Sequence, residues 1–192
     1  MSEETARYTS VAIGLHWLIA VLILGQIAGG LYMADLPFGQ EKFALYQTHK
    51  SFGITILFLS VIRLGWRLTH QPPALPEKMK NWERIAARAT HLGFYGLMIG
   101  IPLGGWAVVS ASPLAESVPT LLFGFIPWPH LPFFADLQNR QEVTDALSQM
   151  HSAAAYGVLF LLVLHLGAAL QHQFIKRDQI LLRMLPGFGR KS

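Results

Sequence analysis

The stretch MHSAAAYGVLFLLVLHLGAALQHQF, residues 150–174, contains no charged residue and is long enough to cross a bilayer as a helix. Of its histidines, His151 and His165 lie fourteen residues apart. At ~1.5 Å and ~100° per residue, their imidazoles lie on roughly the same helix face and about 21 Å apart. A single helix would therefore hold imidazoles at two depths of an apolar core about 30 Å thick. The spacing predicts two metal centres along one membrane helix.

The composition agrees with a membrane setting. Hydrophobic residues make up 52% of the 192 residues and charged residues only 14%, whereas soluble domains usually carry about 25% charge. The chain has no cysteine. This excludes disulfides, iron–sulfur clusters, cysteine-bound zinc and covalently attached c-type haem. Any cofactor must be held by histidine, carboxylate or methionine.

Four apolar segments approach the ~20 residues that a spanning helix needs: residues 11–33, 48–66, 90–109 and 150–171. We therefore expect an all-α fold, an integral membrane four-helix bundle that forms one domain over residues 1–192. The first segment lacks a basic leader and a small-residue cleavage site, so we interpret it as a retained anchor. The outer connection, residues 110–149, contains PTLLFGFIPWPHLPFF at 119–134. Its prolines and aromatic residues predict an interfacial loop, which either covers an outer site or anchors the chain.

The basic residues predict the orientation. Most lie near the N-terminus, around the second connection or in the C-terminal tail: Arg7, Arg63, Arg67, Lys78, Lys80, Arg84, Arg88, Lys176, Arg177, Arg183, Arg190 and Lys191. The other side holds Lys42, Lys50 and Arg140 against six acidic residues, Asp35, Glu41, Glu116, Asp136, Glu142 and Asp145. The positive-inside rule then places both termini in the cytoplasm. The isoelectric point of about 9.6 reflects this topology, and no pattern typical of nucleic-acid binding is present.

Topology sorts the histidines by depth. His16 and His165 lie toward the cytoplasmic ends of the first and fourth segments, while His49 and His151 open the second and fourth segments at the outer side. The predicted pairs are His16 with His165 and His49 with His151. Histidine pairs that face each other across a bundle are a standard way to hold haem b through both axial positions. Small residues near these histidines, in HKSFG, HSAAAYG and HLGAAL, would leave room for a flat macrocycle.

Other residues are secondary candidates. Arg63 and Arg67 could bind the propionates of an inner haem and Lys50 those of an outer haem, or all three could act as snorkelling topology determinants. His91 could contact a quinone or a haem edge, relay a proton, or serve only packing. The segment GIPLGGW, residues 100–106, predicts either a structural kink or a pocket wall, and we favour the kink.

Several motifs together resemble the bacterial cytochrome b561 family of small dihaem membrane cytochromes. They are His16–Trp17 in the first segment, HKSFG at 49–53, SVIRLGWRLTHQPP at 60–73, and HLGAALQHQFIKRDQILLRMLPG at 165–187. The similarity extends from about Arg7 to Pro186 and rests on the order of the motifs. It implies two haem b groups, with axial ligands at His16, His49, His151 and His165, in a multi-pass protein of the bacterial inner membrane.

The resemblance also implies a membrane oxidoreductase that passes electrons between a donor and the ubiquinone pool. Superoxide oxidation coupled to ubiquinone reduction is one activity within the family, although the net negative outer charge would repel superoxide at long range. The alternative is a cytochrome b subunit that anchors and conducts electrons for a separate dehydrogenase or hydrogenase. Non-haem metalloenzymes and transporters are disfavoured, because HExxH spacings, repeats and acidic residues are absent from the predicted spans.

Overall fold

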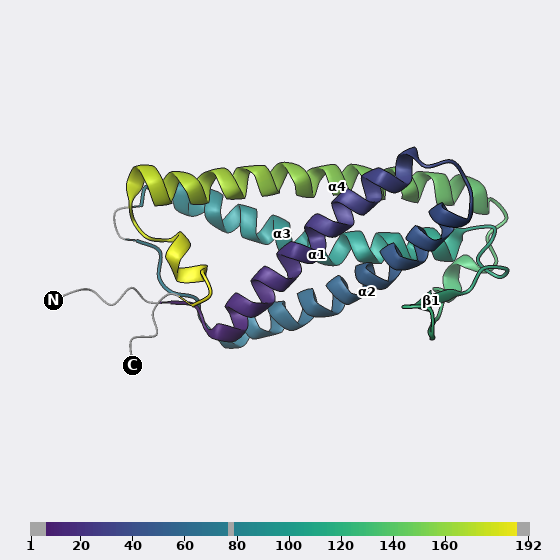
Figure 1. Cartoon of the computed structure of the whole chain (residues 1–192), viewed down its shortest axis with the longest axis horizontal. Coiled ribbons are helices and arrows are strands. Elements are labelled where there is room, and N and C mark those ends of the chain that lie inside the picture. Colours follow the sequence, from purple (N-terminus) through teal and green to yellow (C-terminus); the bar gives the residue numbers. More distant parts are fainter. Residues whose placement is uncertain (1–6, 77–78, 188–192) are drawn as a thin grey trace.

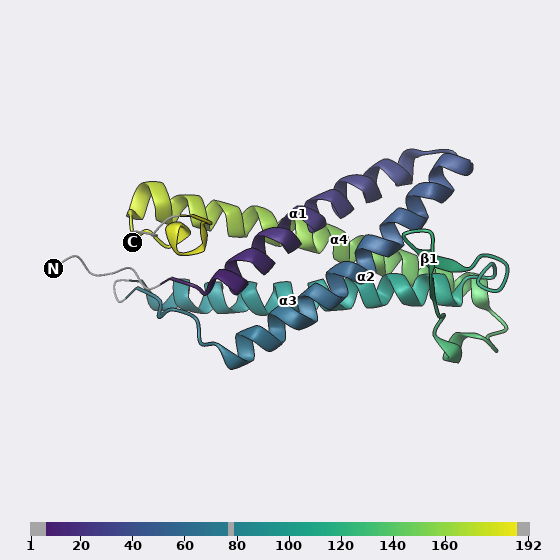
Figure 2. The same cartoon turned by 60° about the horizontal axis from the view of Figure 1, so that its bottom comes forward.

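The computed structural model describes residues 7–76 and 79–187, and four long helices dominate this part of the chain (Figure 1). They are α1 Ser10–Asp35, α2 Gln40–Thr69, α3 Asn81–Ala111 and α4 Arg140–Leu170, and α4 continues into the π-helix η2, Gln171–Lys176. Each helix is long and apolar enough to cross a membrane. The helices run up and down, with main contacts between α1 and α2, α2 and α3, and α3 and α4 (Figure 2). The predicted all-α membrane bundle is confirmed.

Three helices, α2, α3 and α4, begin well before the apolar segments that marked them in the sequence. His49 lies nine residues into α2, which begins at Gln40, and His151 lies eleven residues into α4, which begins at Arg140. Both histidines are therefore about 2.5–3 turns inside their helices, deeper than their place at the start of the apolar segments indicated. Hydropathy marks only the apolar part of a helix, whereas the backbone hydrogen bonds continue through the polar first turns.

The surfaces of the helices are unusually apolar. Large side chains such as Val21, Phe160 and Val163 are more than 60% exposed, while few residues, among them Ile19 and Val158, are fully buried. In water, so much exposed apolar surface would drive association. In hydrocarbon it is the favoured surface, because the backbone groups are satisfied inside each helix.

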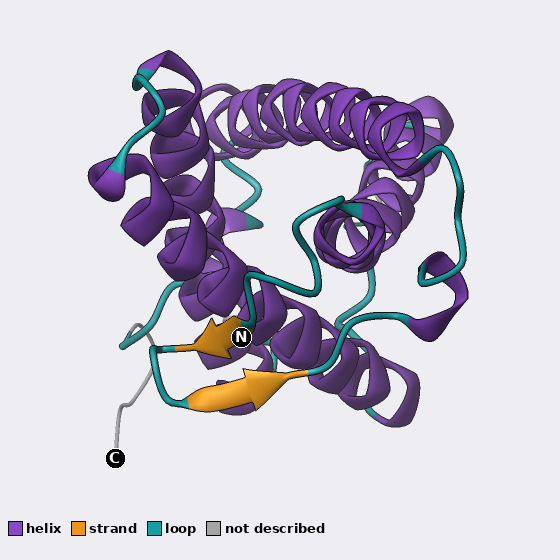
Figure 3. Cartoon of the chain, turned by 90° about the vertical axis from the view of Figure 1, so that its right-hand side faces the viewer, coloured by secondary structure: helices purple, strands orange, loops and turns teal. Residues whose placement is uncertain are grey.

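One connection carries a small sheet that the sequence did not predict. Strands β1 Thr120–Leu122 and β2 Ile126–Trp128 pair antiparallel, and the 3₁₀ turn η1 follows at Pro132–Phe134. Figure 3 shows the two strands across one end of the bundle, which we call the hairpin end. The Phe123 N–H donates to Ser51 Oγ of α2 at 2.8 Å, so the hairpin is fixed to the bundle.

At the opposite end, which we call the terminal end, α1 begins and the C-terminal segment folds back with the 3₁₀ turn η3, Leu181–Met184 (Figure 1). Thr9 Oγ1 accepts from the Ala12 N–H at 3.2 Å and caps α1. The same oxygen accepts from Trp66 Nε1 at 2.9 Å. This hydroxyl therefore joins the beginning of α1 to the end of α2.

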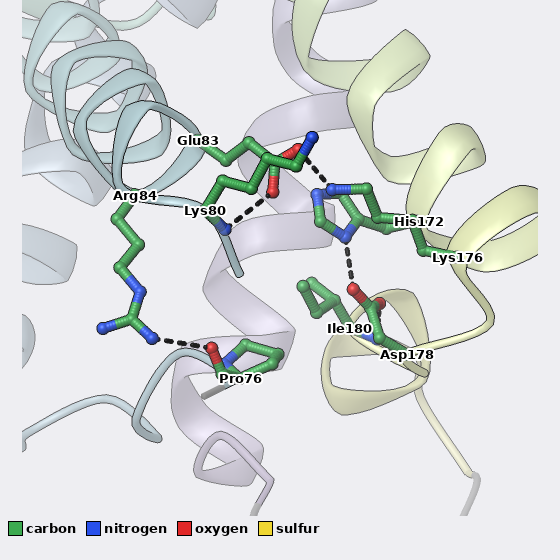
Figure 4. Close-up of polar contacts among 8 residues, drawn as sticks. All are labelled: Pro76, Lys80, Glu83, Arg84, His172, Lys176, Asp178 and Ile180. Atoms are coloured by element: carbon green, nitrogen blue, oxygen red, sulfur yellow. Dashed lines mark hydrogen bonds and ion pairs between the residues drawn. The ribbon is translucent and has the colours of Figure 1, made fainter. Parts of the chain in front are cut away.

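A polar cluster joins α3 to the end of α4 (Figure 4). The Glu83 carboxylate accepts from the Lys80 N–H at 3.1 Å and pairs with Lys176 of η2, while His172 pairs with Asp178. In the π-helical turn η2, the backbone hydrogen bonds join residues five apart, one more than in an α-helix. Of the basic residues used for the orientation, Lys78, Arg190 and Lys191 lie outside the described residues.

Candidate functional site

The structure brings both predicted histidine pairs together across the bundle. The ring centroids of His16 on α1 and His165 on α4 are 6.2 Å apart. Those of His49 on α2 and His151 on α4 are also 6.2 Å apart. Helix α4 thus contributes one ring to each pair, one toward the terminal end and one toward the hairpin end.

The spacing of the rings matches what a metal between two imidazoles requires. An imidazole nitrogen binds a metal such as zinc at about 2.0–2.1 Å, and the ring centroid lies about 1.1 Å beyond that nitrogen, so opposed ligands place their centroids about 6.3 Å apart. Edge-to-face contacts between rings also occur at centroid distances of about 4.5–7 Å, and the two pairs have interplanar angles of 65° and 71°. The spacing of both pairs is compatible with a single iron held between the rings, as in bis-histidine haem.

The pair at the hairpin end lines a cavity of about 340 Å³. All four helices and the hairpin contribute to its wall, including Gly30, His49, Gly105, Thr120, Trp128 and His151. The wall is mainly apolar with a few polar groups, which is the usual character of a cofactor site. Pro102 and Gly105 belong to this wall, so the GIPLGGW segment that we favoured as a kink forms part of a pocket.

Glycines provide the space beside the two rings. A Cβ added at Gly105 would lie 3.1 Å from Cε1 and 3.4 Å from Nδ1 of His151. A Cβ at Gly30 would lie 3.7 Å from Cε1 of His49. A Cβ added at the neighbouring Gly104 would meet no other atom within 4 Å. The bare backbone at Gly105 is therefore what allows α3 to approach the His151 ring.

The orientation of His151 is fixed by a hydrogen bond. Its Nδ1 lies 3.1 Å from the Ile101 carbonyl oxygen. Because the carbonyl only accepts, Nδ1 carries the proton and Nε2 keeps its lone pair. Metal-binding histidines commonly donate their second ring nitrogen in this way.

Two residues of the same cavity wall, Trp128 and Lys50, carry hydrogen-bond donors. The indole Nε1 of Trp128 is buried without a hydrogen-bond partner, although buried donors are nearly always paired. Lys50 Nζ donates to Thr120 Oγ1 at 3.3 Å. No role for Trp128 was predicted from the sequence. Its place between prolines in the outer loop, far in sequence from the histidines, gave no signal that it would line their cavity.

The pair at the terminal end lies in a more crowded cluster. Arg63 donates from Nη1 to the Ala12 carbonyl at 3.0 Å, and its Nη2 lies 3.4 Å from Nδ1 of His16. The ring of Phe94 lies edge-on to His165 at 5.5 Å. Arg67 is near enough to His91 for its charge to act on that ring.

The terminal pair differs from the other pair in having a third histidine, His91, close to it. Its ring centroid lies 6.0 Å from that of His165, so the spacing alone offers His165 two partners. Among the described residues, no group of three or more His, Asp or Glu side chains could hold a metal ion. His91 therefore lies beside the pair, at a distance from His165 similar to that of His16.

Cationic groups lie near the hairpin above the cavity. Burial lowers the pKa of His130 below its ordinary value, and the charges of Lys50 and Arg140 lower it further. His130 is therefore neutral at pH 7, and the positive charge at this place comes from Lys50 and Arg140. Arg140 also pairs with Glu116 at 3.4 Å, which offsets part of that charge.

Comparison with known proteins agrees with this geometry. The sequence profile of the prokaryotic cytochrome b561 family matches residues 7–187. Cytochrome b561 homolog 2 of Escherichia coli K12 is 33% identical over 180 residues, which cover 93% of this chain and 91% of that protein. Cytochrome b561 homolog 1 of the same organism is 27% identical over 181 residues, or 94% of this chain and 97% of the relative.

A third relative is named for an activity. The probable superoxide oxidase CybB of Yersinia pestis is 28% identical over 180 residues, which cover 94% of this chain and 96% of that protein. The match to the family profile extends over nearly the whole described chain. The chain therefore belongs to the prokaryotic cytochrome b561 family of membrane electron-transfer proteins, which carry b-type haem.

Proposed function

We propose that this protein is a dihaem cytochrome that transfers electrons across the membrane to or from ubiquinone. The observation that carries the proposal is the pair of equal 6.2 Å ring spacings, at two depths of the bundle, with α4 common to both. His49 and His151 would hold the outer haem, and His16 and His165 the inner one. Bound haem supplies an iron that takes up and releases one electron at a time.

At the outer site, the chain offers donors for the haem propionates. Trp128, whose indole Nε1 is buried without a hydrogen-bond partner, and Lys50 both line the cavity. Charge-assisted hydrogen bonds of the Lys50 type are about twice as strong as neutral ones. These two residues would fix the rotation of the macrocycle about the axis through its two ligands.

At the inner site, Arg63 and Arg67 would bind the propionates. A His16 that ligates iron through Nε2 keeps its proton on Nδ1. Arg63 Nη2 lies 3.4 Å from that Nδ1. Because the guanidinium has only donors, a protonated Nδ1 would no longer accept a hydrogen bond from it. A propionate oxygen is the replacement that its charge favours. His91 would contact the haem edge or the quinone.

We further propose superoxide as one electron donor, coupled to reduction of ubiquinone. Lys50 and Arg140 concentrate positive charge beside the outer cavity, and such local charge draws small anions. The negative charges of the acidic residues on the same side reduce this attraction for anions. A relative with 28% identity is named a probable superoxide oxidase, which supports the class of reaction.

The alternative function is that of an electron-conducting anchor for a separate dehydrogenase or hydrogenase. Large apolar side chains stand exposed around the hairpin, among them Phe123, Phe125 and Phe133. They suit either the membrane interface or the surface of a partner subunit. The cations beside the outer cavity favour the first function, since a docked partner would cover them.

Detergent-purified protein expressed with sufficient haem should contain about two haem b per chain and show the corresponding reduced-minus-oxidised spectrum. Enzymatically generated superoxide should reduce both haems, and short-chain ubiquinone should reoxidise them. Superoxide dismutase added in excess is the control. Reduction that persists with the dismutase, or that requires an added dehydrogenase, would favour the conducting subunit. Protein without haem would refute the proposal.

The proposed orientation places both termini in the cytoplasm, and hence the terminal end inside. Alkaline phosphatase fused after Ser192 should be inactive, whereas a fluorescent protein that folds only in the cytoplasm should be bright there. A reporter inserted in the connection between η1 and α4, near Asp136, should give the opposite pair of signals. If the signals are exchanged, the inner and outer assignments must be exchanged too.

A further inference from the structure

A second cavity, of about 440 Å³, lies at the terminal end of the bundle. Arg7, Tyr8 and the first two turns of α1 line it, and Pro186 of the C-terminal segment completes the wall. Trp17 Nε1 donates to the Met184 carbonyl at 2.7 Å, which holds this segment against α1. Figure 1 shows the C-terminal segment folded back toward the beginning of α1. The cavity therefore lies where the ends of membrane helices meet the lipid head groups.

The wall that α1 contributes is polar at one end and apolar at the other. Ser10, Ile13, Gly14 and Trp17 line the cavity, and their spacing of three and four residues places them on one face of the helix. From Ser10 to Trp17 the helix rises about 10 Å. A Cβ added at Gly14 would meet no other atom within 4 Å. The cavity therefore extends from a polar mouth along an open apolar stripe, which suits an amphipathic molecule.

Arg7 supplies the positive charge of the polar mouth. Its Nη2 donates to the Leu185 carbonyl, whereas its Nε is buried without a hydrogen-bond partner in the described part of the chain. Buried donors are nearly always paired. A guanidinium carries five N–H donors in a planar fork that matches the oxygens of a phosphate group. Tyr8 and Ser10 add hydroxyl groups to the same wall. The donor set of the mouth therefore suits a phosphate.

The charges around the mouth favour an anion. Glu83 and Asp178 are the acidic side chains described at this end, and each already has a partner, Lys176 and His172 respectively. Arg7 forms no ion pair with any described residue. Basic groups without acidic partners at the membrane surface attract anionic lipids. The terminal end therefore keeps a positive charge that a lipid head group could neutralise.

We propose that this cavity binds one anionic phospholipid, with its phosphate on the guanidinium of Arg7 and an acyl chain along Ile13, Gly14 and Trp17. A free phosphate ion would use only the polar mouth, so the apolar stripe is the observation that favours a lipid. Hydrogen bonds between charged partners such as guanidinium and phosphate are about twice as strong as neutral ones. The bound lipid would join the beginning of α1 to the C-terminal segment. This inference does not depend on the proposed electron transfer.

The test is native mass spectrometry of the purified full-length protein in detergent, titrated separately with phosphatidylglycerol, phosphatidylcholine and inorganic phosphate. The wild type should retain one phosphatidylglycerol per chain and bind it more tightly than phosphatidylcholine. Arg7→Gln should raise the Kd for phosphatidylglycerol about tenfold, as expected when a charged hydrogen bond is lost. Gly14→Leu should also weaken binding, because the leucine would occupy the space of the acyl chain. Inorganic phosphate should not displace the lipid.

Two matched variants serve as controls and should bind lipid like the wild type. Arg88→Gln removes an exposed arginine of α3 at the same end, and Gly25→Leu adds a leucine at another α1 glycine whose Cβ would meet nothing within 4 Å. Wild-type affinity in both Arg7→Gln and Gly14→Leu would overturn the assignment of the cavity. Equal losses in Arg7→Gln and Arg88→Gln, or equal binding of the two lipids, would indicate unspecific attraction and refute the inference. Displacement of the lipid by inorganic phosphate would identify a small-anion site instead.

The haem content of each variant, measured on the same samples, separates this inference from the proposed function. Loss of the lipid from Arg7→Gln with unchanged haem content would support the lipid site by itself. A variant that unfolds is replaced by Arg7→Lys, which keeps the charge but not the planar fork and should weaken lipid binding less than Arg7→Gln does. Arg7→Lys that binds lipid no better than Arg7→Gln would refute a contact that depends on charge.

Discussion

His49→Ala should lower the haem content from about two to about one per chain. The outer iron would lose one axial ligand, because His49 is the histidine whose ring lies 6.2 Å from that of His151. His16→Ala should remove the inner haem in the same way and leave the outer one. Pyridine haemochrome assays against protein concentration measure the loss, and redox titration shows which of two potentials remains.

His91→Ala is the informative comparison for the inner site. Its ring lies 6.0 Å from that of His165, nearly the same distance as His16. If His16 is the ligand, His91→Ala keeps both haems and at most shifts the inner potential. The control is His70→Ala, because His70 ends α2 and stacks on Trp66 at 3.8 Å, away from both pairs. Loss of the inner haem in His91→Ala, with retention in His16→Ala, would replace our assignment.

Gly105→Val should weaken or abolish binding of the outer haem. The Cβ alone would come within 3.1 Å of His151 Cε1, closer than nine in ten real contacts of this kind, and the two methyl groups add further volume. Overpacking typically costs about 1–3 kcal/mol, and here the strain acts on a ring whose Nδ1 is also held by Ile101. Gly105→Ala should show a smaller effect, seen as a shifted potential of one haem.

Gly104→Val is the matched control, because its Cβ meets nothing within 4 Å. Both variants make the same change of helix propensity at adjacent positions of α3, so a difference between them reports the contact with His151. Haem content and thermal unfolding should be measured together. Equal haem content in the two variants would show that the close approach of α3 to His151 does not determine binding of the outer haem.

Much of this protein could be predicted from periodicity and charge. The spacing of His151 and His165 on one apolar segment already indicated two depths, and antiparallel helices then placed His16 and His49 at matching levels. The structure shows both pairs at the same ring spacing. This part was predictable because helix geometry is local and membrane topology leaves few arrangements.

The hairpin and the small residues were not predictable in the same way. Thr120–Leu122 and Ile126–Trp128 are too short and too rich in proline for a strand pattern to be recognised. Trp128 was given no role, and its place in the cavity wall depends on how this hairpin folds over the bundle. Gly105 was seen as part of a kink, since only the packing of α3 on α4 shows that a side chain there would meet His151.

Four properties could be predicted from the sequence alone: the membrane location, the number of helices, the pairing levels of the four histidines and the class of cofactor that they suit. These properties follow from apolar length, charge placement and residue spacing along single helices. Other features appear only once the helices are packed together: His91 lies near His165, and Trp128 and Gly105 belong to the wall of the outer cavity. Each of these is a contact between segments far apart in the chain, and the packing of one segment on another is not encoded in the pattern of either segment alone.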